Sequence, residues 1–474
     1  MANNVKQLEV FTVWSDEIEN RFDPFFYRPI FKKLVATINN AKRKASALGD
    51  IVEFSVAGDW GEDPNTFEPN PEYQLCYVLR NTNFDNRYNL NFDDVAQRYV
   101  KNSKVEKLAL QKGEILIEKS GGSPVQPVGR VAFVEDLPFD KPVVFSNFLQ
   151  KIRITGNSYL PEYVFTFLQA IYHLGYTEFL QNQTTGIKNL RLDDFFKIKI
   201  AELSKDEQKK IAKFAFDARH KAKKMEEEAG QVLTSIDNFV LSELGIDIAG
   251  EHERERVSEA APETYVVWSD VIEKRLDPMY FHPARLRAVE AIKKSGQKIA
   301  SLSEVAEFHR EIVGEIPESV PYLGLENIAS NSGEYVENGD KESVSSAFVF
   351  KRGDVLFPKL RPYLNKVFYA DFDGVCSTEF HVLRAQKCQP FYLFAFLSRS
   401  VVVEQTSRLM TGNTLPRLQT EDVENLLVPV PSVAKQEKIT SGVHSSYSKM
   451  RTLRAQAAEV LESAQKQVEQ MILG

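Results

Sequence analysis

The chain has 474 residues, of which 43% are hydrophobic and 26% are charged, and its formal net charge is −7. These are the proportions of globular proteins, and they exclude wholesale disorder, a fibrous architecture and a basic coat that binds nucleic acid by charge alone. The three cysteines form no CxxC pair, and no apolar run has the length of a membrane span or of a signal peptide. We therefore expect a soluble, cytoplasmic protein without disulfides or membrane contact.

The sequence contains an internal duplication. Val13–Pro29 and Val267–Pro283 are identical at 10 of 17 positions, and further similar segments follow in the same order in both halves. These pairs are KGEIL with RGDVL, YVFTFL with YLFAFL, two Thr-Gly turns, and QKKI with QEKI. We therefore expect two halves that share a scaffold and differ in their loops. The residues do not reveal the role of the duplicated VWSD and Asp-Pro stretch.

Each half begins with an aromatic-rich region, at about 13–203 and 267–430, that is interrupted by turn residues. Short apolar or alternating runs predict strands, and two longer runs at 163–176 and 391–405 predict helices. The predicted strands are Glu114–Ile117, Arg130–Val134, Gln150–Ile154, Val355–Phe357 and His381–Leu383. Both regions should therefore be mixed α/β domains.

Each half ends in a long segment without proline. Apolar residues recur every seven positions from Ile211 to Phe239, and again from Val443 to Met471. This pattern is typical of a coiled-coil seam, and the many alanines on it favour close approach of two helices. The alternative is an amphipathic helix that covers its own domain. A helix of about 38 residues would be roughly 57 Å long, which exceeds the roughly 35 Å of one DNA turn.

We therefore predict an α+β protein with two duplicated mixed α/β domains, separated by two long helices that form an antiparallel coiled coil. A charged linker joins the first helix to the second repeat. The predicted boundaries are 1–203 for the first domain, 204–246 for the central spacer helix, 247–264 for the linker, 265–431 for the second domain and 432–474 for the C-terminal spacer helix.

The sequence carries no motif of a catalytic or cofactor site. It lacks a phosphate-binding P-loop, a glycine-rich dinucleotide turn and a GxSxG nucleophile elbow, and its seven histidines never occur at metal-ligand spacing. Glu118, a possible metal ligand, is replaced by Pro358 in the second repeat. We expect a non-catalytic chain that holds neither metal nor cofactor.

Two pairs of loops carry candidate DNA-binding side chains. One pair follows the strands that end near Ile117 and Phe357, and the other contains the Thr-Gly turns. Lysine, arginine, asparagine and serine side chains donate hydrogen bonds to phosphates and to purine edges in the major groove. The alternative is that these are solvated surface turns. The candidate DNA-binding residues are Lys119, Ser120, Arg130, Lys188, Asn189, Arg191, Lys359, Arg361, Asn365, Lys366, Asn413 and Arg417.

This layout resembles the DNA-specificity (S) subunit of a type I restriction–modification system. The resemblance rests on the duplication, on the order of the paired motifs, and on the QKKI and QEKI openings of the long helices. The motifs are GEILIEKSGG with PVGRVAFV, GDVLFPKLRPYLNKV, TTGIKNLR and MTGNTLPRL. The resemblance covers nearly the whole chain.

The resemblance implies that the two mixed α/β domains are target-recognition domains. Each would read one half-site of double-stranded DNA, which gives an asymmetric bipartite target. It further implies two methyltransferase (M) subunits, which hold S-adenosylmethionine and methylate adenine, and restriction/translocase (R) subunits that use ATP and Mg²⁺. Three alternatives stay open: a coiled-coil adaptor that does not bind DNA, a self-contained methyltransferase or nuclease, and the specificity component of another phage-defence methylation system. The target sequence and its spacer length cannot be deduced from the residues.

Overall fold

The computed structural model describes residues 11–15, 18, 27–29, 44–85, 89–122, 126–155, 158–184, 187–248, 266–267, 272, 277–314, 316, 319–337, 346–412 and 415–473. The chain forms two compact units. Unit 1 comprises Met1–Lys224 with Gln456–Gly474, and unit 2 comprises Met225–Ala455. Ten of the 17 residues of Val13–Pro29, and eight of the 17 residues of Val267–Pro283, lie outside the described residues.

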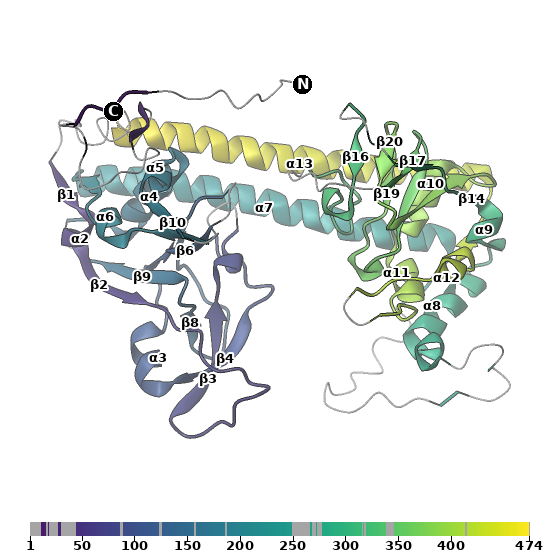
Figure 1. The fold of residues 1–474 in the computed structure, drawn as a ribbon, viewed down its shortest axis with the longest axis horizontal. Helices are drawn as coiled ribbons and strands as arrows, with labels where there is room; N and C mark the ends of the chain where they lie inside the picture. Colours follow the sequence, from purple (N-terminus) through teal and green to yellow (C-terminus); the bar gives the residue numbers. More distant parts are fainter. Residues whose placement is uncertain are drawn as a thin grey trace. The chain divides into compact units, whose positions relative to one another are not determined.

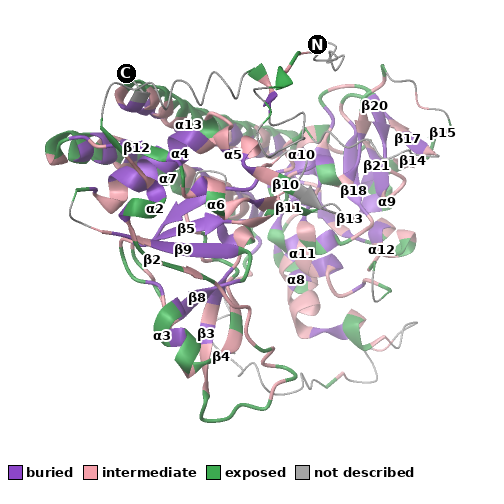
Figure 2. Cartoon of the chain, turned by 60° about the vertical axis from the view of Figure 1, so that its left-hand side comes forward, coloured by how far each residue is buried: buried purple, intermediate pink, exposed green. Residues whose placement is uncertain are grey.

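Unit 1 is built around an antiparallel sheet in the order β2–β9–β5–β7, whose strands β5 and β9 are buried along most of their length (Figures 1 and 2). Helix α4 (Pro161–His173) packs against this sheet in a shared apolar core. A second sheet has the order β4–β3–β8, and helix α3 (Asn102–Leu108) comes directly after β4. A third sheet has the order β10–β11–β6. The strands are β2 Val52–Ala57, β3 Tyr73–Leu79, β4 Ala96–Lys101, β5 Ile115–Glu118, β6 Ser120–Gly122, β7 Val131–Phe133, β8 Val143–Phe145, β9 Leu149–Ile154, β10 Gln181–Thr184 and β11 Ile187–Leu190.

Unit 2 repeats this plan with shorter strands. Its central sheet has the order β14–β21–β18–β19, and a second sheet has the order β15–β17–β20–β16. Helix α10 (Pro390–Leu397) is the counterpart of α4. The strands are β14 Ala306–His309, β15 Ile312–Val313, β16 Tyr322–Leu323, β17 Ala347–Phe350, β18 Val355–Pro358, β19 Phe368–Tyr369, β20 Gly374–Cys376 and β21 Phe380–Ala385.

The single helix predicted at 391–405 is two helices, α10 and α11 (Ser400–Thr406). The break falls at Ser398, whose carbonyl oxygen accepts a hydrogen bond of 3.0 Å from the Asn365 side chain. Arg399 then adopts an extended backbone conformation. A tertiary contact, which no local pattern encodes, therefore ends α10.

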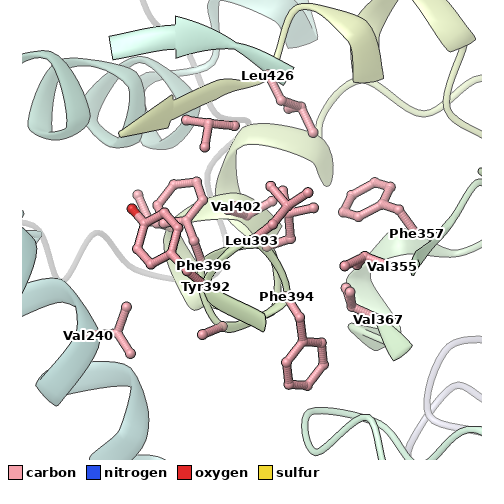
Figure 3. Close-up of a cluster of buried hydrophobic side chains, with 14 of the residues drawn as sticks. Val240, Val355, Phe357, Val367, Tyr392, Leu393, Phe394, Phe396, Val402 and Leu426 are labelled. Atoms are coloured by element: carbon pink, nitrogen blue, oxygen red, sulfur yellow. The ribbon is translucent and has the colours of Figure 1, made fainter. Parts of the chain in front are cut away.

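The core of unit 2 surrounds α10. Tyr392, Leu393 and Phe396 are at most 1% exposed, and Figure 3 shows the α10 side chains between Val240 of the long helix α7 (Lys205–Leu244) and the β18 side chains Val355 and Phe357. A fully buried aromatic or leucine side chain contributes about 1.5–3 kcal/mol through the hydrophobic effect. The long helix is therefore part of the domain core as well as a connection between domains.

The two halves share a buried carboxylate that pairs with a partly exposed arginine, which explains the repeated Gly-Glu and Gly-Asp motifs. In unit 1, the carboxylate of Glu114, which is 1% exposed, accepts from Arg153 at 2.7 Å. In unit 2, Asp354 is 2% exposed and forms two bonds of 3.0 Å with Arg384. Each carboxylate also accepts a backbone N–H from the turn that precedes it, so the acidic residue joins the turn to the sheet.

The two long helices, α7 and α13 (Val433–Leu473), run antiparallel within each unit (Figure 1). In unit 1, Ile211 near the start of α7 shares an apolar cluster with Ile472 at the end of α13. In unit 2 the other two helix ends meet. Lys438, near the start of α13, pairs with Glu243, near the end of α7, at 2.7 Å. The predicted antiparallel coiled coil is confirmed.

Candidate nucleic-acid interface

In unit 1, the candidate loop begins where β5 ends. The N–H of Lys119 donates to the Phe148 carbonyl at 2.9 Å, and the Lys119 carbonyl accepts from the N–H of Leu190 at 2.8 Å. The next residue, Ser120, pairs across β6 and β11 with Asn189. The Ser120 hydroxyl donates to Oδ1 of Asn189 at 2.6 Å, so backbone and side-chain bonds together fix the orientation of this amide.

An aromatic side chain and a lysine lie at this edge of the sheet. Phe148 is 40% exposed, which is unusual for a phenylalanine, whereas Lys119 is half-buried. Burial lowers the pKa of the Lys119 ammonium group. Because a lysine ammonium group is costly to bury, the position of Lys119 supports a binding role for this edge.

In unit 2, the loop after β18 has the same backbone connections. The N–H of Lys359 donates to the Glu379 carbonyl at 2.8 Å, and its carbonyl accepts from Leu418 at 2.9 Å. The next residue, Leu360, forms a β-bridge with Arg417. Lys359 and Lys119 therefore occupy equivalent positions, and so do Arg417 and Asn189.

Counting residues from the two Thr-Gly turns would instead align Arg417 with Arg191. The backbone bonds show that the turn in unit 2 is longer, and that the true counterpart of Arg417 is a neutral asparagine. Arg191 does not take part in the pairing of β11 with β6, and its side chain pairs with Asp194 at 2.8 Å. Lys188, on β11, is half-buried.

Arg417 is held by a carboxylate. Glu379 accepts Nε of Arg417 at 2.9 Å and Nη2 at 2.8 Å. The Lys359 ammonium donates to the Thr378 carbonyl at 2.7 Å and lies 4.9 Å from the centre of the Phe348 ring. Burial lowers the pKa of Lys359, and the nearby Glu379 partly opposes this shift.

Arg361 and Lys366 lie on the same loop. Arg361 is exposed and has a left-handed backbone (φ 49°), and its N–H donates to the Pro416 carbonyl at 3.0 Å. Lys366 is half-buried, and its ammonium donates to the Leu325 carbonyl at 2.8 Å. The Arg361 backbone is thus beside the Arg417 segment, while Lys366 supports the loop from within.

The structure places two of the predicted DNA-binding residues in the interior. Arg130 is 7% exposed, and its guanidinium binds both carboxylate oxygens of Glu118 at 2.8 Å and the Asn81 carbonyl at 3.0 Å. Asn365 is also 7% exposed and is the residue that ends α10. Because their donors serve internal acceptors, we remove Arg130 and Asn365 from the candidate interface. Asn413 lies outside the described residues.

Two residues of the interface escaped the sequence motifs. Glu379 and Phe148 precede β21 and β9, far along the chain from the loops they border, and each reaches them through a backbone bond. The sequence indicates these two residues only by their position, because Phe148 and Glu379 come directly before β9 and β21, which are equivalent strands in the two units. Across the described ranges, no three His, Cys, Asp or Glu side chains converge as metal ligands. Within the same ranges, no helix combines the length and apolar character of a membrane span.

The chain matches the family described as type I restriction modification DNA specificity domain, over residues 41–228 and 301–463. The two matched regions fall in the two sequence repeats, and together they cover most of the chain.

The similarity to individual proteins of known sequence or structure is low. The type I restriction enzyme EcoDI specificity subunit of Escherichia coli is 28% identical over 122 residues, which are 26% of this chain and 27% of that protein. The chain thus matches about a quarter of the length of this curated relative. A type I restriction–modification S subunit from M. genitalium is 13% identical, with a TM-score of 0.41, over 92% of this chain and 97% of that one. A chain from a structure on assembly and conformational transition of the type I R-M system is 12% identical, with a TM-score of 0.43, over 90% and 96%.

Proposed function

This chain belongs to the type I restriction modification DNA specificity family, and we propose that it reads an asymmetric bipartite DNA target and directs adenine methylation or cleavage by partner subunits. Unit 1 would read one half-site and unit 2 the other. The chain itself contributes recognition and no chemistry.

One observation carries this proposal: the two units present different side chains on the same backbone frame. Lys119 and Lys359 are common to both frames, whereas Asn189 is replaced by Arg417. A shared cation suits phosphate, which is the same in every sequence, and a variable polar group suits base edges. Two different sets of base-contacting side chains on one scaffold would recognise two different half-sites.

The partners follow from the family. We propose that the chain works in the cytoplasm with double-stranded DNA, two methyltransferase subunits and restriction/translocase subunits. S-adenosylmethionine, ATP and Mg²⁺ would be held by those subunits. The net charge of −7 supports a need for partners, because non-specific DNA affinity depends on phosphate neutralisation by cations. We expect weak DNA binding by the chain alone and tight binding by the complex.

The test is to co-express the chain with its methyltransferase subunits and to map methylated adenines by single-molecule sequencing. The expected result is one bipartite motif with two unrelated half-sites and a fixed spacer. An adaptor that binds only proteins would leave the methylation pattern unchanged when this chain is removed. A self-contained methyltransferase would methylate DNA in the absence of the partners.

A further inference from the structure

The guanidinium of Arg417 is bound along one edge and open along another. Glu379 occupies the side edge, with Nε–Oε1 at 3.1 Å, Nε–Oε2 at 2.9 Å and Nη2–Oε1 at 2.8 Å. An arginine has five N–H donors in a planar fork. The remaining donors, on Nη1 and the outer side of Nη2, form the end edge and have no partner among the described residues.

This pair is accessible, and its side chains do not hold the loop together. The Arg417 side chain is 43% exposed and that of Glu379 is 27% exposed. The hairpin is closed by backbone bonds, because Arg417 and Thr411 exchange two N–H donors at 2.9 Å. An ion pair this exposed contributes at most about 1 kcal/mol to stability. Its precise geometry therefore has little structural purpose.

An end-on guanidinium edge matches one base in particular. Guanine presents two acceptors, O6 and N7, side by side in the major groove, and the two parallel N–H groups of arginine bind both. A carboxylate on the adjacent edge fixes the plane of the guanidinium and reduces the entropy lost on binding.

We propose that Arg417 reads a guanine in the half-site recognised by unit 2, and that Glu379 is its positioning residue. This inference rests on the proposed function and adds the base and the donor edge to it. Arg361, which is exposed and joined by its backbone to Pro416, provides a neighbouring cation for the DNA backbone.

The equivalent place in unit 1 has different chemistry. Phe148 stands where unit 2 has Glu379, Ser120 stands where it has Leu360, and Asn189 stands where it has Arg417. Because this position in unit 1 carries a neutral amide, a guanidinium–guanine contact is absent from it. Asn189 thus supplies a matched control for substitution of Arg417.

The experiment uses the chain assembled with its methyltransferase subunits and duplexes of the mapped target. Each guanine is replaced in turn by 7-deazaguanine, which lacks the N7 acceptor. For the wild-type complex we expect one position, in one half-site, where this replacement weakens binding at least about fivefold, the effect of one lost hydrogen bond. In the Arg417→Ala complex the same replacement should change binding less than twofold. Arg417→Lys should retain only part of the effect, since a lysine ammonium can also donate to O6 and N7 but lacks the planar fork that Glu379 orients.

Glu379→Gln separates positioning from folding. Loss of the carboxylate should weaken discrimination at that guanine, while affinity for random duplex stays equal or rises because a negative charge has been removed. A purely structural role would lower both affinities together and would lower the melting temperature of the complex. Asn189→Ala should leave the guanine effect intact and alter preference in the other half-site only.

The outcomes distinguish this inference from the function on which it rests. A wild-type complex without any preferred sequence would contradict the proposed function itself. A specific complex whose 7-deazaguanine effect persists in Arg417→Ala, or whose Arg417-dependent half-site contains no guanine on either strand, would contradict the assignment of Arg417 alone.

Discussion

Two buried glutamines attach the long helices to the recognition domains. Oε1 of Gln208 accepts the N–H of Leu160, which caps α4, at 2.7 Å, and Oε1 of Gln436 accepts the N–H of Gln389, which caps α10, at 2.8 Å. Gln208 is fully buried and Gln436 is 3% exposed. Their amide groups also donate to nearby carbonyls. The QKKI and QEKI motifs therefore encode a junction between helix and domain.

Gln208→Ala and Gln436→Ala should each destabilise the protein by about 1–3 kcal/mol, because each leaves a buried N–H and carbonyl groups without partners. Chemical denaturation of the full chain measures this loss. Lys209→Ala, one residue along on the exposed face of α7, is the control and should change stability by less than about 0.5 kcal/mol. Equal effects of Gln208→Ala and Lys209→Ala would show that the glutamine junction is unimportant.

Lys119 should make the free energy of unfolding depend on pH in the alkaline range. Burial lowers the pKa of Lys119 in the folded state, so between this lowered value and the ordinary 10.5 the unfolded chain binds more protons. Stability contributed by this residue therefore rises with pH through that window. We expect Lys119→Met to be more stable than the wild type at neutral pH and to lose this advantage as pH approaches 10.5.

Thermal melting of both proteins from pH 7 to pH 10.5 measures the difference, in which the titration of all other groups cancels. The same variant should bind DNA more weakly in the assembled complex, with a salt dependence reduced by about one ion. A stability difference that stays constant with pH would indicate that Lys119 is not strained by burial. Lys197→Met, on an exposed lysine, is the matched control.

The two long helices are charged in a way that selects their antiparallel pairing. The first half of α7, residues 205–224, has eight basic and three acidic residues, whereas residues 225–244 have five acidic residues and no lysine or arginine. In α13, residues 433–455 have five basic residues and one acidic residue, and residues 456–473 have three acidic residues and one basic residue. Antiparallel pairing places opposite net charges together within each unit, and a parallel arrangement would bring like charges together.

The Lys438–Glu243 ion pair tests this charge pattern. Lys438→Glu should destabilise the chain by about 1 kcal/mol, since it replaces an attraction at the surface of unit 2 with a repulsion. Exchanging both residues, in Lys438→Glu with Glu243→Lys, should recover most of the loss, and a double-mutant cycle measures the coupling. The coupling should shrink in high salt. Independent, additive effects of the two substitutions would contradict the proposed role of the pair.

The long helices were predictable because their apolar period and their charges are local properties of the sequence. The duplication also paired the loop at Lys119 with the loop at Lys359, and the backbone bonds of these two residues are equivalent in the two units. Two features of the candidate residues were not predictable, because they depend on contacts between distant segments. Glu379 reaches Arg417 across 38 positions of sequence, and the burial of Arg130 depends on Glu118 and on the Asn81 carbonyl. Loop composition alone cannot distinguish a surface arginine from one that is used internally.

At the scale of the whole chain, α7 and α13 each belong to both compact units, since the unit boundaries fall at Lys224 and Ala455. Each helix is continuous across its boundary. If the proposed function is correct, helix length sets the distance between half-sites, while the loops set the bases. The two properties should then change independently.

Deleting one heptad from each helix, residues 222–228 and 453–459, preserves the seven-residue apolar pattern and shortens both helices by about 10.5 Å. At about 3.4 Å per base pair, the spacer between half-sites should shorten by at most about three base pairs. The half-site sequences should stay the same, because neither deletion includes a residue of the candidate interface. Mapping of methylated adenines in cells that express the shortened chain with its partners measures spacer and bases together.

The control removes residues 222–228 from α7 alone. This shortens α7 by seven residues relative to α13, so the apolar seam and the Lys438–Glu243 register cannot both be kept. We expect a less stable chain and no new spacer. The paired deletion should restore stability while changing the spacer. A paired deletion that alters the preferred bases and leaves the spacer unchanged would show that the helices take part in base selection, and would exclude their role as a spacer.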